Sequence, residues 1–599
     1  MPTSPPFDDS RRLTGPNLYF AGTGAVLETA IGPDVPGPLV AAWGRNVAAA
    51  RAALGWPDGP LVARRHASGA SLAFTAPGDA LYAATEANEW AWLAALAGAG
   101  RDTGPRQLQP GHAPPDDAAI AFRILQAAAD AERVPGLAAL RGAATERGLP
   151  LLLDEEQASI GLGTGSMTWD LARLPAPGEV PWARLHAIPV ALVTGSNGKT
   201  TSVRLLAAMA MAHGWHTANS CTDGLYVDGA LVEPGDYSGP GGARALLRDR
   251  RAQAAVLETA RGGLLRRGLG VARADVALVT NLSPDHFGEY GIHDLDGLAE
   301  VKLTVARAVR DATLVLNADD PVLRRHAAAL DQALAWFSQD DDHPLLHAAR
   351  AAGRRSCGLR DGRLVLWDGG AAHDLGAVAG MPLTLGGLAG HNIENCAGAA
   401  LAASVLGIAP ATIAAVLARF GRRHGDNPGR LQRWSFADGT QAYVDYAHNP
   451  DGLGKLLALV RRAHGGGRLH VLLGQAGNRS DDAIAELAAT AAGFAPDHVV
   501  LKDMDSAYMR GRESGAVAGL LRAALLAGGL PASAIEECLD EAEAARLILA
   551  RARPGDSLVL PVHGPAARAR VVALLDALDA AGWRAGDALP VFDGEGQPA

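Results

Sequence analysis

A short apolar run that begins at Ala187 leads directly into a glycine-rich turn, Gly195-Ser196-Asn197-Gly198, and then into Lys199-Thr200. A buried strand, a tight glycine turn and a helix in this order let backbone N–H groups approach phosphate oxygens closely, and the helix N-terminus adds a partial positive charge. The stretch therefore predicts an open parallel α/β sheet with a phosphate-binding loop at the carboxyl end of one strand.

This turn departs from the strict phosphate-loop pattern G-x-x-x-x-G-K-[ST], because the first glycine of that pattern would fall at Val193. Lys199 can still reach the β- and γ-phosphates of a nucleotide, and the Thr200 hydroxyl can bind Mg²⁺. A plain glycine-rich turn between a strand and a helix is the alternative. The positions predicted to bind the nucleotide phosphates are Gly195, Ser196, Asn197, Gly198, Lys199, Thr200 and Thr201.

Lysine is rare in this chain, and only four of its 54 Lys and Arg residues are lysines. Arginine is always charged, whereas lysine offers a compact amine that can lose its proton, so each lysine is a candidate for chemistry that arginine cannot perform. Lys199 and Lys302 lie in segments with further chemical features. Lys455 and Lys502 are interpreted as lysines that were retained by chance in a chain that otherwise uses arginine.

Two potential metal ligands follow predicted strands. Glu258 ends the apolar run 254–258, and His286 comes just after the run 275–280. Ligands gather at the carboxyl ends of the strands in an open α/β sheet, so both side chains should face the glycine turn. A carboxylate and a neutral imidazole are reasonable Mg²⁺ ligands beside ATP oxygens. For His286 alone, a helix-capping or core histidine is the alternative.

Lys302 lies beyond His286 on an amphipathic stretch, residues 295–309. A free ammonium beside a metal would be repelled, whereas a neutral amine can take up CO₂ and become a carbamate, an anionic oxygen ligand. Carbamate formation needs the lysine pKa to fall well below about 10.4, which burial or metal capture could achieve. The alternative is a lysine that pairs with a phosphate or with Glu300.

Apolar runs separated by helix-compatible stretches indicate βαβ units in two parts of the chain. We predict three domains: an N-terminal α+β domain at 1–185, a central ATP-binding parallel-sheet domain at 186–424, and a C-terminal Rossmann-like α/β domain at 425–599. The expected strands are 254–258, 275–280, 312–316, 441–445, 469–474, 498–503 and 557–562, with helices at 83–98, 117–132 and 482–493.

Bulk composition excludes several classes of protein. The net charge of −10 argues against non-specific nucleic-acid binding, which needs a basic face. The four cysteines show no C-x-x-C spacing, so a zinc site or a disulfide framework is not expected. No apolar signal core and no span of about 18 uncharged apolar residues is found, which predicts a soluble cytoplasmic protein without a membrane partner. The oligomeric state stays open, a homo-oligomer included.

Six motifs together resemble, in order, the ATP-dependent Mur ligase superfamily over roughly residues 186–599. Within that superfamily the segments 258–269 and 509–521 are most similar to the C-terminal, Mur-ligase-like half of cyanophycin synthetases. The segments 13–22 and 154–169 resemble parts of their front half, without the ATP-grasp module that would lie between. The six motifs are TGSNGKTTS, TNLSPDH followed by Lys302, LNADDP, GHNIENCAGA, GRL around Arg430, and VDYAHNP.

The resemblance implies a role for each matching position. The residues implied to surround Mg²⁺ are Thr200, Glu258, His286 and a carbamylated Lys302, and those with direct catalytic roles are Lys199, His286 and Lys302. The residues implied to contact the nucleotide from the adenine side or from the third domain are Asn392, Asn395, Arg430, Asp445 and His448.

The implied activity is ADP-forming ligation of an acid to an amine. ATP would activate the carboxylate of an acidic peptide or amino acid as an acyl phosphate, which an amino-acid amine would then attack. A cyanophycin-like aspartyl substrate, with arginine as one candidate amine, is the first interpretation. The alternatives are a non-catalytic or regulatory partner of a full-length cyanophycin synthetase and a Mur ligase acting on another acidic peptide. A P-loop motor or kinase would leave Lys302 unexplained.

A charged segment after the predicted strand 498–503 is the candidate substrate site. Arg510 and Arg512 are fork-shaped donors suited to a substrate carboxylate. Asp503, Asp505 and Glu513 could hold a cationic side chain such as that of arginine, although a solvated charged loop is the alternative for all five. Some Mur ligases carry D-N-P-R in the comparable region, and its absence here weighs against diaminopimelate as the amine.

Overall fold

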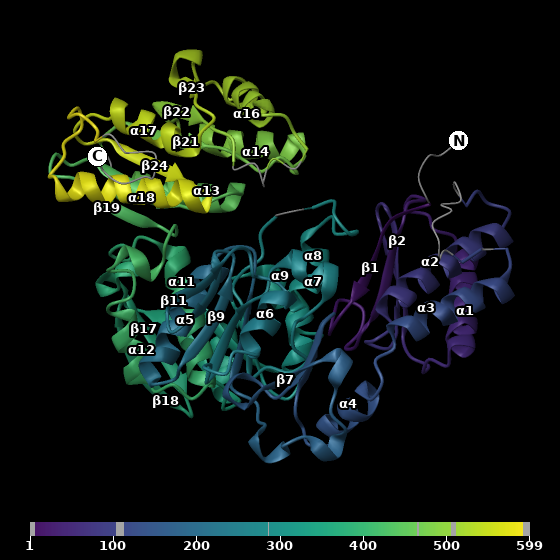
Figure 1. Cartoon of the computed structure of the whole chain (residues 1–599). Coiled ribbons are helices and arrows are strands. Elements are labelled where there is room, and N and C mark those ends of the chain that lie inside the picture. Colours follow the sequence, from purple (N-terminus) through teal and green to yellow (C-terminus); the bar gives the residue numbers. More distant parts are fainter. Residues whose placement is uncertain are drawn as a thin grey trace. The chain divides into compact units, whose positions relative to one another are not determined.

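The computed structural model describes residues 6–103, 113–114, 116–284, 287–463, 466–504, 509 and 511–590 (Figure 1). The chain divides into two compact units. The N-terminal unit comprises residues 1–375 and 394–416, and the C-terminal unit comprises residues 376–393 and 417–599. The three domains with boundaries near 185 and 424 stay a prediction.

The N-terminal unit begins with an antiparallel sheet in the order β1-β2-β4-β3, packed against helices. Its core joins apolar side chains of β2 and β4 to the helices, and it includes Trp43, Phe74 and Trp92. This arrangement is the predicted α+β fold, and the helices predicted at 83–98 and 117–132 are present. The elements are β1 (Phe7–Leu13), β2 (Gly24–Thr29), α1 (Gly37–Leu54), β3 (Leu61–His66), β4 (Gly69–Thr75), α2 (Leu81–Gly98) and α3 (Ala118–Glu132).

A small segment connects this sheet to the next one. It contains one helix and a three-stranded antiparallel sheet in the order β5-β6-β7. The elements are α4 (Leu137–Glu146), β5 (Leu151–Leu153), β6 (Gln157–Ile160) and β7 (Met167–Asp170).

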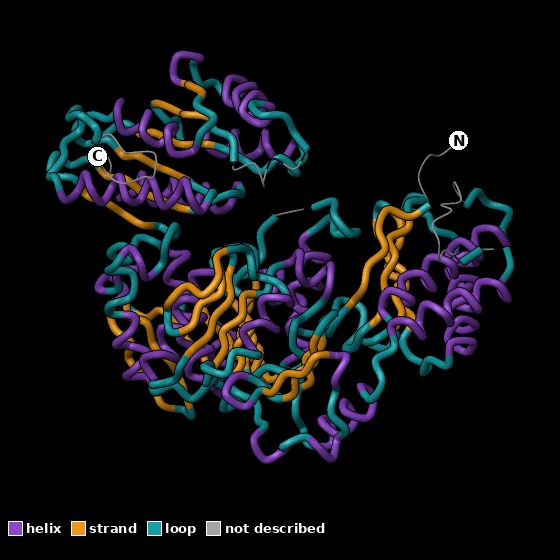
Figure 2. The backbone as a smooth tube through the Cα atoms, viewed as in Figure 1, coloured by secondary structure: helices purple, strands orange, loops and turns teal. Residues whose placement is uncertain are grey.

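The largest sheet has eleven strands in the order β11-β10-β9-β12-β8-β13-β14-β15-β16-β17-β18 (Figure 2). The seven adjacent strands β9-β12-β8-β13-β14-β15-β16 pair in parallel. At the two sides of this group, β10 pairs antiparallel with β9 and with β11, and β17 pairs antiparallel with β16. The strands are β8 (Val190–Thr194), β9 (Thr217–Cys221), β10 (Gly224–Val227), β11 (Ala230–Pro234), β12 (Ala254–Glu258), β13 (Val276–Val279), β14 (Thr313–Asn317), β15 (Ala333–Ser338), β16 (Ser356–Arg360), β17 (Arg363–Asp368) and β18 (Ala371–Ala377).

Strands β8, β12 and β13 are buried along their whole length, as expected for parallel strands covered on both faces. They lie side by side, so the residues that follow β8, β12 and β13 meet at one edge of the sheet. The accompanying helices are α5 (Lys199–His213), α6 (Pro240–Leu247), α7 (Arg261–Arg267), α8 (Leu295–Lys302), α9 (Pro321–Ala327), α10 (Pro344–Ala351), α11 (Gly390–Val405) and α12 (Pro410–Leu417).

The C-terminal unit contains a six-stranded sheet in the order β19-β20-β24-β21-β22-β23, parallel except for β19. This sheet confirms the predicted second α/β fold. Its elements are β19 (Gln432–Ser435), β20 (Gln441–Asp445), α13 (Pro450–Ala463), β21 (Leu469–Leu473), α14 (Asp481–Ala492), β22 (His498–Leu501), α16 (Ala516–Ala527), β23 (Ile535–Glu537), α17 (Glu541–Arg551), β24 (Ser557–Pro561) and α18 (Pro565–Ala580). Among the helices of the described residues, none has the length and apolar character needed to cross a membrane.

Candidate functional site

The turn between β8 and α5 requires glycine at two positions. Gly195 has a φ of 140° and Gly198 a φ of 83°, both in the region that side chains rarely adopt. A Cβ atom at Gly195 would lie 1.9 Å from Thr280 Oγ1, and one at Gly198 would lie 2.2 Å from Asn395 Oδ1. The two glycines therefore let the turn pack directly against the end of β13 and against α11, which places Asn395 beside the loop.

Side chains that follow β13 hold this turn in shape. Thr280 Oγ1 donates a hydrogen bond to Asn197 O over 2.6 Å. The side chain of Asn281 accepts from the backbone N–H of Asn197 at 3.0 Å and donates to its carbonyl oxygen at 3.1 Å. The backbone N–H of Ser283 donates to Ser196 Oγ at 3.0 Å. The sequence motif around Asn281 gave no sign of this bracing role, because the contacts join segments that are distant along the chain.

Glu258 is a buried carboxylate beside the first turn of α5. The residue is 1% exposed, and its oxygens accept hydrogen bonds from Thr200 Oγ1 at 2.8 Å and from Thr222 Oγ1 at 3.0 Å. These partners are neutral, and Glu258 forms no ion pair with any residue that the structure describes. A buried carboxylate without a positive partner is costly. Since carboxylate and hydroxyl oxygens are hard ligands, Glu258 and Thr200 fit a Mg²⁺ ion.

Lys302, the last residue of α8, directs its amine to the glycine turn. The residue is 4% exposed, and its Nζ donates to Gly195 O at 2.7 Å. Lys199, the first residue of α5, donates its Nζ to Ser196 O at 3.0 Å. The two lysines singled out from the sequence, Lys199 and Lys302, thus contact the same four-residue turn although they are far apart along the chain.

Three of the predicted site residues lie outside the described residues: the metal ligand His286 and the substrate contacts Asp505 and Arg510. Among the residues that are described, no group of three or more His, Cys, Asp and Glu side chains is arranged to hold a metal ion. The described protein ligands that fit Mg²⁺ are therefore Thr200 and Glu258.

In the C-terminal unit, two predicted nucleotide contacts lie at the carboxyl end of β20. The carboxylate of Asp445 accepts from the backbone N–H groups of Leu431 and Ala447, each at 2.7 Å. Burial raises the pKa of Asp445 above its ordinary value. His448 follows in the same loop, with its Nδ1 3.1 Å from Tyr446 O. Asp445 therefore fixes the start of the loop that carries His448.

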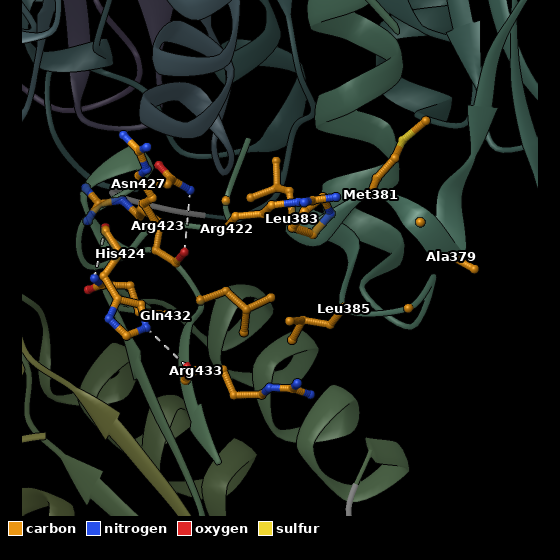
Figure 3. A pocket seen from close by; sticks show the side chains of 16 residues that line it. Ala379, Met381, Leu383, Leu385, Arg422, Arg423, His424, Asn427, Gln432 and Arg433 are labelled. Atoms are coloured by element: carbon orange, nitrogen blue, oxygen red, sulfur yellow. Dashed lines mark hydrogen bonds between the residues drawn. The ribbon is translucent and has the colours of Figure 1, made fainter. Parts of the chain in front are cut away.

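The C-terminal unit contains a pocket of about 430 Å³ (Figure 3). Arg430 is one of the residues that line it. Side chains from residues 379–386 and 421–433 surround this pocket. The Arg430 guanidinium lies 4.2 Å from the centre of the Tyr446 ring, a cation–π arrangement. Asn392 is buried and donates its Nδ2 to a backbone carbonyl of the pocket wall at 2.9 Å. The pocket thus presents four arginine side chains, those of Arg422, Arg423, Arg430 and Arg433, together with apolar side chains.

The predicted substrate segment is largely engaged with its own chain. Asp503 accepts from the backbone N–H of Gly515 at 3.0 Å at the start of α16. Arg512 donates to Asp481 Oδ1 at 2.7 Å and to two carbonyls of the preceding glycine-rich loop at 2.8 and 2.9 Å. Glu513 is exposed. The geometry gives Asp503 and Arg512 structural partners, and the substrate role of the segment stays a prediction.

Lys502 has a structural role that the sequence did not predict, because it was interpreted as a lysine retained by chance. The residue is fully buried and forms an ion pair with Glu541, and its Nζ lies 2.9 Å from His563 Nδ1. The other carboxylate oxygen of Glu541 accepts from the backbone N–H of Gly564 at 2.7 Å. His563 Nε2 lies 3.1 Å from Ala447 O, in the loop after β20. We call Lys502, Glu541 and His563 the buried triad.

The buried triad fixes the protonation of its histidine. A lysine ammonium offers only donors, so His563 Nδ1 accepts and Nε2–H donates to Ala447 O. Burial, assisted by the positive charge of Lys502, lowers the pKa of His563 to about 4. A neutral His563 therefore links the triad to the loop that holds Asp445 and His448.

Stability is expected to fall on acidification because of this histidine. The pKa of His563 is about 4 when folded and about 6.5 in an unfolded chain, so the unfolded state binds more protons between these values. The stabilising contribution is complete above about pH 6.5 and decreases as the pH falls toward 4. Urea unfolding followed between pH 7.5 and 4.5 measures the change. The H563Q variant should show a weaker pH dependence, and an equal dependence in both proteins would contradict this expectation.

Two family models match the chain. The Mur ligase middle domain matches residues 193–403, and the Mur ligase glutamate ligase domain matches residues 429–561. The chain belongs to the Mur ligase family. The first match covers the glycine turn, Glu258 and Lys302, and the second covers the loop with Asp445 and His448.

Curated relatives of this Mur ligase family member fall into two groups. The chain is 34% identical over 374 residues to the cyanophycin synthetase of Geminocystis herdmanii, covering 62% of this chain and 42% of the relative. The corresponding protein of Trichormus variabilis is 36% identical over 383 residues, covering 64% and 42%. The chain thus matches less than half the length of these relatives. The UDP-N-acetylmuramoyl-L-alanyl-D-glutamate–2,6-diaminopimelate ligase of Xanthomonas campestris is 34% identical over 324 residues, covering 52% and 61%.

Solved structures that resemble this chain have lower sequence identity to it than these relatives do. E. coli FolC in complex with DHPP and ADP matches with a TM-score of 0.48 and 19% identity, covering 65% of this chain and 89% of that chain. A Mycobacterium tuberculosis folylpolyglutamate synthase complexed with ADP matches with a TM-score of 0.47 and 18% identity, covering 64% and 90%.

Proposed function

We propose that this Mur ligase family member is an ATP-dependent, ADP-forming ligase that joins an amino-acid amine to the carboxylate of an acidic peptide. The observation that carries the proposal is that two rare lysine amines contact one glycine turn and that a buried carboxylate, which forms no ion pair with a described residue, contacts the helix that follows the turn. The names of the relatives support the same class of reaction, since both groups are synthetases or ligases.

ATP is proposed to lie with its phosphates along the glycine turn. The backbone N–H groups at the start of α5 point toward this position, and the Lys199 amine can turn from Ser196 O to the phosphate oxygens. Thr200 and Glu258 would hold Mg²⁺, which neutralises charge on the β- and γ-phosphates when bound. Lys302 would complete this environment, as a carbamate or as an ammonium.

Two displacements make the proposed reaction. A carboxylate oxygen of the acceptor attacks the γ-phosphorus, the bond from that phosphorus to the β,γ-bridging oxygen breaks, and ADP leaves. The amine nitrogen then attacks the acyl carbon, the bond from that carbon to the phosphate oxygen breaks, and phosphate leaves while the amine proton passes to solvent. Lys199 stabilises the charge that develops on the transferred group. Arg430 and the loop with His448 are proposed to contact the nucleotide from the C-terminal unit.

The proposed acceptor is an aspartyl peptide of the kind that a cyanophycin synthetase would use, and arginine is the first amine to test. A screen for phosphate release can test this with the full chain, ATP and Mg²⁺. Aspartate, β-aspartyl-arginine, a cyanophycin primer and murein precursors would each be combined with a panel of amino acids. Phosphate release that needs both an acceptor and an amine is the expected result. Absence of release in every combination would contradict the proposal.

Replacing Lys302 is expected to abolish this phosphate release, because Lys302 Nζ is the amine that donates a hydrogen bond to Gly195 O in the glycine turn. The variant is K302M, and its matched control is K455M, since Lys455 is an exposed lysine paired with Asp451 in the C-terminal unit. Thermal unfolding checks that both variants fold.

A carbamate on Lys302 has a readout of its own. After incubation with ¹³C-bicarbonate, the wild-type chain should show a carbamate resonance in its ¹³C NMR spectrum that K302M lacks and K455M retains. If K302M turned over ATP as fast as K455M does, Lys302 would have no part in the reaction.

A further inference from the structure

A large cleft lies within the N-terminal unit, away from the glycine turn. Its volume of about 1370 Å³ exceeds the 300–1,000 Å³ that is typical of small-molecule pockets. Segments that are far apart in the sequence line it, among them residues 14–16 near the start of the chain, residues 148–157 around β5, and Arg267 with residues 269–273 at and after the end of α7. The size favours a ligand of several residues.

The cleft is lined by one buried and two half-buried arginines that form no ion pair with a carboxylate of the described residues. Arg244 is 8% exposed, and its Nη2 donates to Thr14 O at 3.0 Å and to Thr14 Oγ1 at 2.7 Å. Arg267 donates only to backbone carbonyls, at 3.1 and 3.4 Å. The guanidinium of Arg141 donates no hydrogen bond to a described residue. None of the three forms an ion pair within the described part of the chain.

Burial disfavours the charged form of these three guanidinium groups. Burial lowers the pKa of Arg244 to about 10, and it also lowers the pKa values of Arg141 and Arg267. The charges of Arg244 and Arg267 further oppose each other. A positive charge that is largely removed from water without an anion beside it is unfavourable, so an anionic ligand would stabilise all three.

Four of the five acidic residues that line the cleft accept hydrogen bonds or form ion pairs with other groups, and the fifth, Glu156, is exposed. Asp79 and Glu132 accept from backbone N–H groups, Asp154 pairs with Arg248, and Glu155 pairs with Arg12. The negative charges of Asp79, Asp154 and Glu155 act to raise the pKa values of Arg141, Arg244 and Arg267 respectively, but burial outweighs them in each case. The acidic residues that line the cleft are Asp79, Glu132, Asp154, Glu155 and Glu156.

The walls of the cleft are held rigidly. The backbone N–H of Thr14 donates to Arg267 O at 2.8 Å, and that of Leu269 donates to Pro16 O at 2.7 Å. A Cβ atom at Gly15 would lie 2.2 Å from Leu269 O, so the two segments are in direct backbone contact. Such a frame holds Arg267 in place before a ligand arrives, which lowers the entropic cost of binding.

We propose that this cleft binds an extended acidic peptide through the guanidinium groups of Arg141, Arg244 and Arg267. The inference builds on the proposed function, because the ligand belongs to the class of the carboxylate acceptor. Helix α7 begins three residues after Glu258 and ends at Arg267, a length of about 10 Å. A peptide in the cleft would therefore lie one short helix away from the glycine turn.

Binding of a fluorescein-labelled hexa-aspartate peptide to the full chain tests the proposal without ATP. Fluorescence anisotropy should show saturable binding, and unlabelled hexa-asparagine should not compete. The R141M and R267M variants should each weaken binding about tenfold or more, as expected for loss of a charge-assisted hydrogen bond. The matched control is R307M, because Arg307 is also half-buried, donates to a backbone carbonyl and forms no described ion pair, but does not line the cleft.

The outcomes separate the cleft from the proposed ligase activity. Equal affinity in wild type, R141M and R267M, an equal loss in R307M, or no binding of hexa-aspartate would overturn the cleft proposal. Saturable binding that K199M retains, in a chain that releases no phosphate in any screen, would support the cleft and contradict the ligase. Thermal unfolding of each variant shows that a loss of binding is not a loss of folding.

Discussion

The K199M variant is expected to release phosphate from ATP about 10²–10³-fold more slowly than the wild-type chain, the usual effect of removing one group that stabilises transition-state charge. The Lys199 amine lies at the start of α5, 3.0 Å from Ser196 O, where it can turn to the phosphates of a bound nucleotide. Methionine keeps the length of the side chain and removes its charge. The measurement is the initial rate of phosphate release with the acceptor and amine found in the screen.

Two further variants sharpen this result. K199R keeps the charge but replaces a compact ammonium with a planar guanidinium, so it should not restore the rate. K455M changes an exposed lysine of the C-terminal unit and should leave the rate unchanged. A K199M rate within twofold of the wild-type rate would show that the glycine turn does not bind the reacting phosphates.

The second large effect is on stability. Replacing Glu541 with leucine leaves the fully buried ammonium of Lys502 without its anion, which is expected to cost about 3–5 kcal/mol in the free energy of unfolding. For a unit of roughly 200 residues, this corresponds to a decrease in Tm of about 6–20 °C. Urea and thermal unfolding of the full chain, followed by a probe in the C-terminal unit, measure the change.

A double variant distinguishes an unpaired charge from a general packing defect. E541L combined with K502M removes both charges, and it should recover a large part of the lost stability because no buried ion remains unpaired. If the double variant were as unstable as the sum of the two single variants, the ion pair would not be the cause of the loss.

The sequence predicted the central parallel strands closely and the outer strands poorly. The runs at 254–258 and 441–445 coincide with β12 and β20, because β12 is buried along its whole length and the three central residues of β20 are buried, so both strands have an apolar centre. Strand β11 could not be predicted in this way, since all its residues are exposed and it is defined only by its pairing with β10. Exposed edge strands of this kind show no regular spacing of apolar residues in the sequence.

In the candidate site, too, the residues that could be predicted are those marked by their neighbours in the sequence, whereas residues whose role depends on partners far along the chain could not be predicted. Lys199 and Glu258 could be singled out because Lys199 comes shortly after a recognisable strand and Glu258 ends one. Lys502 also follows a strand, but its role depends on Glu541 and His563, which α17 and the end of β24 bring to it. The three arginines proposed to bind a peptide in the cleft come from α4, α6 and α7, and no local sequence pattern relates them.

Transfer of ¹⁸O from the acceptor to phosphate tests the proposed carboxylate activation most directly. The acceptor from the screen would carry ¹⁸O in both oxygens of its reacting carboxylate, and the released phosphate would be analysed by mass spectrometry. Attack of the carboxylate on the γ-phosphate predicts one ¹⁸O atom in each phosphate formed together with an amide bond. Amide formation with unlabelled phosphate would contradict it.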